Sequence, residues 1–473
     1  MKHFLKNLFI LSTSLLVLTI IITAKPSGEN IYKERRSRFI EKMENGVAVF
    51  AGNKSINYSG DADYDFRQNA DFYYLTGYDR PGASLILVKG KESKSILFIN
   101  EPSTYSQVYN GMEPSLDEVK NLYGFDKVYY TGDFDDILNK QPVTQNTIYY
   151  SFSDEELNKK INDLFDSNYR KPKEIVDSEI ITRDLRVIKS EKEIELLQKA
   201  IDITNAAQFE ALKKTKPGMN ESELQALIEY TFRVNGSPRN GFPSIVGSGK
   251  NSCVLHYGEN NNVINDNVTV VLDIGAEYGN YSADVTRTIP SNGKFTDEQK
   301  TIYNIVYNAQ KQAIEMVKPG IKLTDVHNKT FKVIKDELYK LGLVTDTSKN
   351  WQTRMWYPHG SSHWLGLDTH DAGDYKYREG GRELETGMVF TVEPGIYIGE
   401  AILSIAEKMP GGFIPKDELA KFKDDIKEAF EKYKNIGIRI EDDILVTEDG
   451  YKNLSEGAPK RIDEIEKLMS SSN

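Results

Sequence analysis

The sequence predicts an α/β protein built from two domains. A chain of 473 residues is too long for one ordinary domain, and 39% hydrophobic with 28% charged residues is typical of a globular protein. Short strand-like and helix-like segments alternate over residues 31–170, and longer helices with acid-bearing apolar strands follow over residues 180–465. We therefore expect an N-terminal α/β domain over the first range and a larger domain over the second.

The chain begins with a pattern typical of a signal peptide. Basic residues precede an apolar run over residues 8–23, and Ala24 supplies a small residue for cleavage. Ile22 is bulkier than the usual residue at its position, which leaves an uncleaved membrane anchor as the alternative. In either case we expect residues 1–24 to direct export, so that the protein is periplasmic, secreted or anchored facing outward.

Charge and cysteine content exclude several classes of protein. The formal net charge is −11 and no basic stripe stands out, which argues against a nucleic-acid partner. The single cysteine, Cys253, excludes an intrachain disulfide and is predicted to be a small core residue rather than a nucleophile. An exported chain of this kind depends on its core and on bound metals for stability.

The N-terminal domain shows strands but no catalytic cluster. Apolar segments at residues 47–51, 84–88 and 95–100 predict strands, the last two joined by a Lys-Gly-Lys turn. The polar, lysine-rich residues 171–178 are interpreted as the linker to the second domain.

The second domain opens with a helix signal that recurs later in the chain. Ser190 and Glu193 form a capping box before an amphipathic helix that stops at the Lys-Pro-Gly of residues 216–218. A helix over residues 296–317 ends in the same tripeptide, and another helix begins at Thr324. This echo predicts a duplicated helix-and-strand unit whose two sheets close around one site.

The first copy of this unit carries two aspartates on a predicted hairpin. Asp273 ends an apolar strand, and a strand over residues 281–288 returns after a turn at residues 278–280. If Tyr278 and Gly279 are the two loop residues, Asp273 lies directly opposite Asp284, with their Cβ atoms about 5 Å apart. A turn shifted by one residue would move the residue opposite Asp273 by two positions, which leaves both aspartates on the same face of the hairpin.

The second copy carries two glutamates. Glu393 ends an apolar strand before a Pro-Gly turn, where an acid needs a partner. Along residues 437–444 the alternation of a strand puts Arg439 and Glu441 on one face.

Three of the six histidines, His359, His363 and His370, lie in one short segment. A proline and two glycines within it disfavour a zinc-binding helix, so we expect an irregular loop in which one histidine binds metal and the others bind substrate or move protons. His256 joins them only if its loop folds back, and His327 is interpreted as solvated.

Four carboxylates and one imidazole form the ligand set of a paired divalent-metal site. Four buried carboxylates would cost many kcal/mol unless cations neutralised them, and two divalent ions supply four positive charges. The candidate ligands are Asp273, Asp284, His363, Glu393 and Glu441. The set predicts a metallohydrolase.

These motifs resemble the metal-dependent aminopeptidase P and prolidase family, which shares the pita-bread fold with methionine aminopeptidase. The resemblance implies a creatinase/aminopeptidase P-like α/β domain followed by a pita-bread catalytic domain. It is carried by residues 65–78, 255–257, 273–275, 282–287, 358–371, 392–395 and 439–443.

The resemblance implies roles for the site residues. The five candidate ligands would hold two ions, manganese first, with cobalt, zinc and magnesium as alternatives. A metal-bridging hydroxide would attack the carbonyl of the first peptide bond while Glu393 accepts a proton. His256 and His370 would contact the scissile amide and stabilise the tetrahedral intermediate, and His359 and Arg439 would hold the residue after the cleaved bond, preferably proline.

The run at residues 361–368 favours an Xaa-Pro aminopeptidase that acts on peptides with proline second. An Xaa-Pro dipeptidase is the alternative, and a non-catalytic peptide-binding protein is disfavoured because all five ligands are present. We also expect a homo-oligomer.

Two segments depart from the family pattern. Residues 400–434 form an insertion with an amphipathic helix near residues 416–433. We favour a solvated surface helix; the alternatives are that it caps the substrate entrance or mediates contacts between subunits. Residues 109–113 lack the tryptophan and arginine that many relatives carry, so the resemblance does not extend to substrate contacts from this segment.

Overall fold

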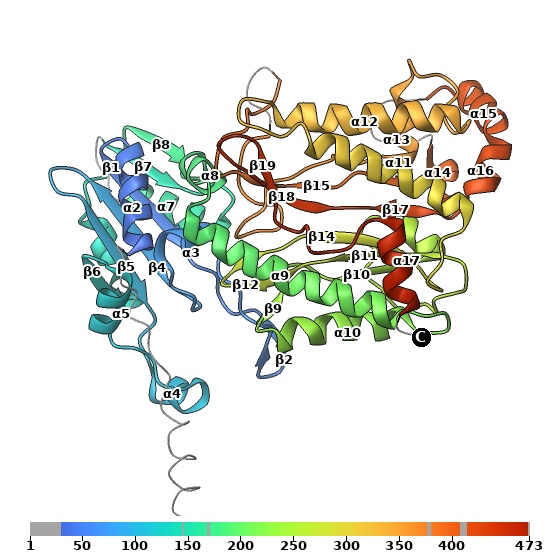
Figure 1. Ribbon diagram of the computed structural model, residues 1–473. Coiled ribbons are helices and arrows are strands. Elements are labelled where there is room, and N and C mark those ends of the chain that lie inside the picture. The colour runs from blue at the N-terminus through green and yellow to red at the C-terminus, as the bar shows by residue number, and fades with distance from the viewer. Residues whose placement is uncertain (1–29, 144–145, 168–170, 376–379, 407–413, 472–473) are drawn as a thin grey trace, which may run out of the picture. The chain divides into compact units, whose positions relative to one another are not determined.

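The computed structural model describes residues 30–143, 146–167, 171–375, 380–406 and 414–471 (Figure 1). The predicted signal peptide or anchor at residues 1–24 lies outside them. Among the described residues, no helix has both the length and the apolar character needed to span a membrane. The chain divides into two compact units, Met1–Ile181 and Thr182–Asn473.

The first unit is built on a six-stranded mixed sheet of order β6-β5-β4-β1-β7-β8. Its strands are β1 (Gly46–Ala51), β4 (Ser84–Lys89), β5 (Lys94–Ile99), β6 (Lys127–Tyr130), β7 (Thr147–Tyr150) and β8 (Glu174–Asp177). Its helices are α2 (Ile31–Lys42), α3 (Ala70–Thr76), α4 (Thr104–Asn110), α5 (Leu116–Tyr123), α6 (Phe134–Asn139) and α7 (Glu155–Ser167), and a small hairpin joins β2 (Asn57–Ser59) to β3 (Ala62–Asp63). The three predicted strands are confirmed.

The predicted linker at residues 171–178 is wrong in part, because β8 lies inside it. Ile175 and Val176 pair in parallel with Ile148 and Tyr149 of β7. Four residues with two apolar side chains suffice for an edge strand whose partner is already in place, and the flanking lysines masked this signal.

The second unit contains two copies of a helix pair with strands. The first copy has α9 (Glu191–Lys214), α10 (Glu221–Val234), β10 (Ile245–Ser248), β11 (Thr269–Ile274) and β14 (Val285–Pro290). The second has α11 (Asp297–Ile314), α12 (Leu323–Lys340), β15 (Val389–Val392), β18 (Asp442–Val446) and β19 (Tyr451–Asn453). Helix α9 packs against β14 and α11 against β15, with the strands running between the helix pairs (Figure 1).

Shorter elements complete the second unit. They are α8 (Glu179–Val187), which begins in the first unit, β9 (Arg239–Asn240), η2 (Gly249–Cys253), β12 (Ala276–Tyr278), β13 (Tyr281–Ser282), α13 (Asn350–Trp356), β16 (Gly395–Tyr397), β17 (Gly437–Arg439) and α17 (Ile462–Ser470). The capping box at Ser190 and Glu193 is confirmed at the start of α9.

The predicted duplication has a physical counterpart in two buried glutamines. Gln208 of α9 donates from Nε2 to the carbonyls of Leu272 and Val285, at 3.1 and 2.8 Å. Gln310 of α11 donates in the same way to the carbonyls of Val392 and Ile440, at 3.0 and 3.1 Å. Three of the four accepting residues, Leu272, Val392 and Ile440, immediately precede a candidate ligand in the sequence, and the fourth, Val285, immediately follows Asp284. One helix in each half therefore ties together the two strands that carry that half's acids.

A hairpin turn within residues 278–280 is confirmed, but its two loop residues come one position later than Tyr278 and Gly279. The turn is Gly279-Asn280, with φ of 58° and 67°, because glycine and asparagine accept the positive φ that a tight hairpin turn requires and tyrosine does not. Asp273 consequently pairs with Thr286 rather than with Asp284. Because the pairing partner of Asp273 moves by two residues, Asp273 and Asp284 remain on the same face of the hairpin.

The interpretation of the insertion as a solvated helix is also wrong. It contains α14 (Glu400–Ile405), α15 (Lys416–Asp425) and α16 (Lys427–Tyr433). Phe422 and Phe430 are buried in the core of the second unit. Their rings lie 5.0 Å from that of Trp351 and 6.1 Å from that of Trp356, respectively, so one face of the insertion packs against α13.

Candidate metal centre

Three of the five candidate ligands surround the imidazole of a fourth, His363. Nε2 of His363 lies 3.4 Å from Oδ2 of Asp284, and 3.7 Å from both Oε1 of Glu393 and Oε1 of Glu441. Asp284, His363 and Glu441 are buried, and one ligand atom from each lies within 4.8 Å of the other two. These residues lie far apart in the sequence, and the fold brings them together as predicted.

Backbone bonds between strands fix these side chains. The N–H of Glu441 donates to the carbonyl of Thr286 at 3.1 Å, and the Thr286 hydroxyl donates to Oε2 of Glu441 at 2.7 Å. The N–H of Glu393 donates to the carbonyl of Ser361 at 2.8 Å. The N–H of His363 donates to Oγ1 of Thr391 at 3.1 Å. Glu441 is therefore held by a strand of the first half, Glu393 by the histidine loop and His363 by β15.

Asp273 lies beside this group in an ion pair. Its Oδ2 is 2.5 Å from Nη2 of Arg439, and its charge contributes to raising the pKa values of Asp284 and Glu393. Its Oδ1 is buried without a hydrogen-bond partner, as is Oδ1 of Asp284. The predicted shared face of Arg439 and Glu441 is consistent with this arrangement, since Arg439 contacts one acid of the cluster directly.

Asp284, Glu393 and Glu441 are protonated more readily than ordinary carboxyl groups. Burial and the charge of Glu441 raise the pKa of Glu393 to about 8 and that of Asp284 well above its usual range. Burial opposes the charge of His363, but the carboxylates of Asp284 and Glu441 outweigh it and raise the pKa of the imidazole. The cluster therefore carries more negative charge than the surrounding protein neutralises.

The donor set fits divalent cations. Buried acceptors without a partner are rare in folded proteins, and two of them, Oδ1 of Asp273 and Oδ1 of Asp284, belong to candidate ligands. Carboxylate oxygens with one imidazole suit manganese, magnesium, cobalt or zinc. Glu393, Glu441 and His363 complete the set of residues that would hold two ions.

The other predicted site histidines surround the cluster. His359 lies with Nδ1 3.5 Å from Oε2 of Glu393, and burial with the nearby Arg439 lowers its pKa to about 3. The ring of His370 is 4.1 Å from that of His363, and burial and that neighbour lower its pKa to about 4. His256, on an exposed turn after η2, is close enough to affect the pKa values of both His359 and His370.

Sequence reasoning missed Tyr397. Its hydroxyl accepts from Nη1 of Arg439 at 2.8 Å and lies 2.9 Å from Nε2 of His359. Burial raises its pKa, so the hydroxyl stays protonated. The available signal was register, because β16 follows the Pro-Gly turn after Glu393 and pairs with the strand that carries Arg439.

His327 was interpreted as solvated, and that is wrong. His327 is half-buried on α12, and its Nδ1 lies 2.9 Å from Oγ of Ser361. Ser361 itself stands between His359 and His363 in the sequence. Ser361 also contacts the hydroxyls of Tyr357 and Thr330. A polar residue on a helix gave no sign of this contact, because the partner lies 34 residues away along the chain.

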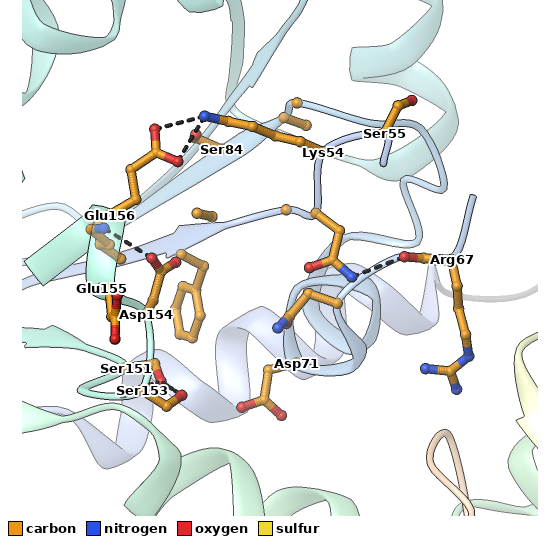
Figure 2. Close-up of a pocket in the computed structure, with 18 of the residues that line it drawn as sticks. Lys54, Ser55, Arg67, Asp71, Ser84, Ser151, Ser153, Asp154, Glu155 and Glu156 are labelled. Carbon is orange, nitrogen blue, oxygen red and sulfur yellow. Dashed lines mark hydrogen bonds and ion pairs between the residues drawn. The ribbon is translucent and has the colours of Figure 1, made fainter. Parts of the chain in front are cut away.

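A separate cavity of about 770 Å³ lies in the first unit. Figure 2 shows Lys54 bonded to Glu156 on one wall, while Asp71 and Arg67 lie on another. The cavity is lined by Lys54, Asp71, Glu156 and other residues of that unit, and none of the predicted site residues line it. The candidate chemistry therefore lies in the second unit.

Comparisons with known proteins agree with this location. Residues 195–448 match metallopeptidase family M24, and residues 32–149 match the aminopeptidase P N-terminal domain. The chain is 34% identical to the Xaa-Pro aminopeptidase of Escherichia coli, over 93% of this chain and 97% of that protein. It is 31% identical to human Xaa-Pro aminopeptidase 3, over 90% and 81%.

Solved structures of E. coli aminopeptidase P share the fold. A variant in complex with substrate superimposes with a TM-score of 0.83 at 32% identity, covering 93% of this chain and 98% of that one. The zinc-substituted protein in complex with product gives a TM-score of 0.84 at 32% identity, covering 94% and 98%.

Proposed function

This chain belongs to metallopeptidase family M24 and is a metallo-aminopeptidase, and on that premise we propose that it removes the N-terminal residue from peptides whose second residue is proline. The two Xaa-Pro aminopeptidases named above match this chain over 97% and 81% of their own lengths, which supports this substrate class. The observation that carries the proposal is the convergence of Asp284, His363 and Glu441 within 4.8 Å, with Glu393 beside them.

The residues that would hold two divalent ions are Asp273, Asp284, His363, Glu393 and Glu441. When bound, such ions supply Lewis acidity and an activated water molecule. We propose manganese as the natural metal, because a carboxylate-rich set favours a hard cation.

The surrounding side chains would bind and orient the peptide. Glu393 is placed to accept a proton, since its carboxylate faces both His363 and His359. His359, Tyr397 and Arg439 form a continuous polar chain that would hold the residue after the cleaved bond. A neutral imidazole can donate to a carbonyl from one nitrogen while it accepts at the other, which suits His359 to this role.

On the open side of the cluster, His256 and His370 would contact the scissile amide. The low pKa of His370 keeps its ring neutral at physiological pH. The ring therefore adds no charge to a site in which bound metal ions would neutralise the carboxylates. A hydrogen bond from the neutral imidazole of His370 to the developing oxyanion would stabilise the transition state.

The test is a peptide panel with the metal content measured on the same protein. Purified protein is assayed on an Xaa-Pro dipeptide, an Xaa-Pro-Xaa-Xaa peptide and its Xaa-Ala-Xaa-Xaa analogue, after chelation and after return of each metal. We expect cleavage of the longer proline peptide, with manganese restoring the highest rate. Cleavage of the dipeptide alone would make the protein a prolidase, and equal cleavage of the alanine analogue would reject the proline preference.

We further propose that residues 1–24 export the protein and that it forms a homo-oligomer. The apolar run followed by Ala24 supports export. N-terminal sequencing of the protein from cell fractions distinguishes cleavage from anchoring, and light scattering of the purified protein measures its mass.

A further inference from the structure

Glu221, in the first turn of α10, is a fully buried carboxylate with neutral partners. Its side chain is 0% exposed, and among the described residues no lysine, arginine or histidine forms an ion pair with it. Its charge is stabilised by hydrogen bonds and by the positive end of the helix. Such a group needs a structural reason, because burying a carboxylate without a cation is costly.

All of its partners lie on one loop, residues 248–262. Oε1 accepts from the N–H of Ser248 at 2.8 Å, its hydroxyl at 2.6 Å and Nδ2 of Asn251 at 3.2 Å. Oε2 accepts from the hydroxyl of Tyr257 at 2.8 Å and the N–H of Asn262 at 3.0 Å. One carboxylate thereby joins both ends of the loop and its middle to α10.

The middle of that loop carries His256. Its side chain is exposed, so packing around the ring does not fix it and its neighbours must. On one side the carbonyl of Leu255 accepts from Nη2 of Arg439 at 3.5 Å, and the same guanidinium pairs with Asp273. On the other side Tyr257 bonds to Glu221. His256 therefore lies between an anchor on the acid cluster and an anchor on α10.

We propose that Glu221, through Tyr257, is a positioning residue for His256. The proposal rests on the proposed function, in which His256 contacts the scissile amide. Preorganisation of such a contact is worth a large factor in rate, since a displacement of about 1 Å can cost roughly 100-fold. Glutamine cannot replace Glu221, because each carboxylate oxygen accepts from a backbone N–H, and one of the two would face the amide NH2 group.

The test is a double-mutant cycle on kcat/KM with an Xaa-Pro-Xaa-Xaa peptide. Tyr257→Phe removes one hydroxyl and is expected to lower kcat/KM roughly 10-fold, and Glu221→Gln roughly 100-fold. If the two residues act through His256, Tyr257→Phe has no further effect in a His256→Ala background, to within about twofold. An equal loss in both backgrounds, or no loss in either, would overturn the proposal.

A matched control and a second readout separate positioning from general destabilisation. Tyr303→Phe removes a buried hydroxyl that donates to the carbonyl of Lys460 at 2.9 Å, and it is expected to leave kcat/KM within about twofold of wild type. Hydrogen exchange of residues 254–262 should speed up in Tyr257→Phe while metal content is unchanged. Unaltered exchange would contradict the proposal even if the protein does not cleave proline peptides. If Glu221→Gln does not fold, Tyr257→Phe alone still tests the proposal.

Discussion

Glu441 and Asp442 are consecutive buried carboxylates with opposite electrostatics. Burial and the neighbouring acid Asp273 raise the pKa of Glu441. Burial also opposes the charge of Asp442, but the cations of Lys460 and Arg287 outweigh it and lower its pKa. Nη2 of Arg287 lies 2.7 Å from Oδ1 of Asp442, and both side chains are 0% exposed.

The difference separates a metal site from a structural ion pair. Asp442 is neutralised by two protein cations, and Asp371 likewise pairs with Arg186 and Lys189. Among the residues that the structure describes, the four acids of the ligand cluster have Arg439, on Asp273, and the imidazole of His363, which would itself bind metal. Burial alone is therefore no guide to metal binding, and the missing positive charge is what a pair of divalent ions would supply.

The largest effect is expected from Asp284→Asn. Removing one anionic ligand should lower kcat/KM by roughly 1,000-fold or more, because several kcal/mol of metal-dependent transition-state stabilisation are lost. Metal content measured by elemental analysis should fall in parallel. The exposed Asp463, on α17, offers the control Asp463→Asn, which should keep both. Retained metal and activity in Asp284→Asn would reject the assignment of the cluster.

Asp442→Asn tests the other side of the comparison. It leaves the buried Arg287 and the partly buried Lys460 without their shared carboxylate, so the free energy of unfolding should fall by about 3–5 kcal/mol. Urea denaturation of the metal-free protein measures this change. Asp284→Asn should be neutral or stabilising under the same conditions, because burial and the charge of Glu441 disfavour a negative charge on Asp284 in the metal-free protein. Equal destabilisation by the two variants would contradict the distinction between a structural ion pair at Asp442 and a metal site at Asp284.

Much of the site was predictable because Asp273 and Glu393 end apolar runs, while Asp284 and Glu441 lie on segments predicted to be strands. Alternation along strands placed Asp273 and Asp284 on one face even though the turn was assigned one residue early, since a shift of two preserves the face. The clustering of histidines marked a functional loop, and the structure brings His359 close to Glu393.

What the sequence could not supply was the identity of long-range partners. Nothing local distinguishes Glu441 from Asp442, because the cations that neutralise Asp442 lie 155 and 18 residues away. Tyr397 was missed for the same reason, as its role depends on Arg439 from the next strand. The insertion was misjudged because a helix that is half polar fits a solvated surface and a core edge equally well.

Removal of metal should give stability an unusual pH dependence. Glu393 has its pKa raised to about 8 in the folded, metal-free protein, against an ordinary value of 4.5, so the folded state binds more protons than the unfolded state between these pH values. Stability should therefore fall as pH rises through this window, by up to about 1.4 kcal/mol per pH unit from one such group. Thermal unfolding with and without manganese measures this. We expect the metal to raise Tm more at pH 8 than at pH 6, and a smaller gain at pH 8 would contradict an unneutralised cluster.

The smallest effect should come from Gln310→Leu, at the point where the two regions meet. Its Nε2 donates to the carbonyls before Glu393 and Glu441, while its Oε1 accepts from Nζ of Lys460, the partner of Asp442. Leaving those buried carbonyls unpaired should cost about 1–3 kcal/mol, and metal affinity should fall roughly 10-fold as the ligand strands loosen.

Gln208→Leu is the matched variant in the other half, since Gln208 bonds its two strand carbonyls in the same way and its Oε1 has no hydrogen-bond partner. Both variants should weaken metal binding, measured by competition with a chelator. Only Gln310→Leu should also destabilise the metal-free protein through Lys460, because only that glutamine contacts the Asp442 ion pair. If the two variants lose equal stability, Gln310 does not couple the Asp442 ion pair to the ligand cluster. The ion pair and the cluster are then each stabilised by their own strands.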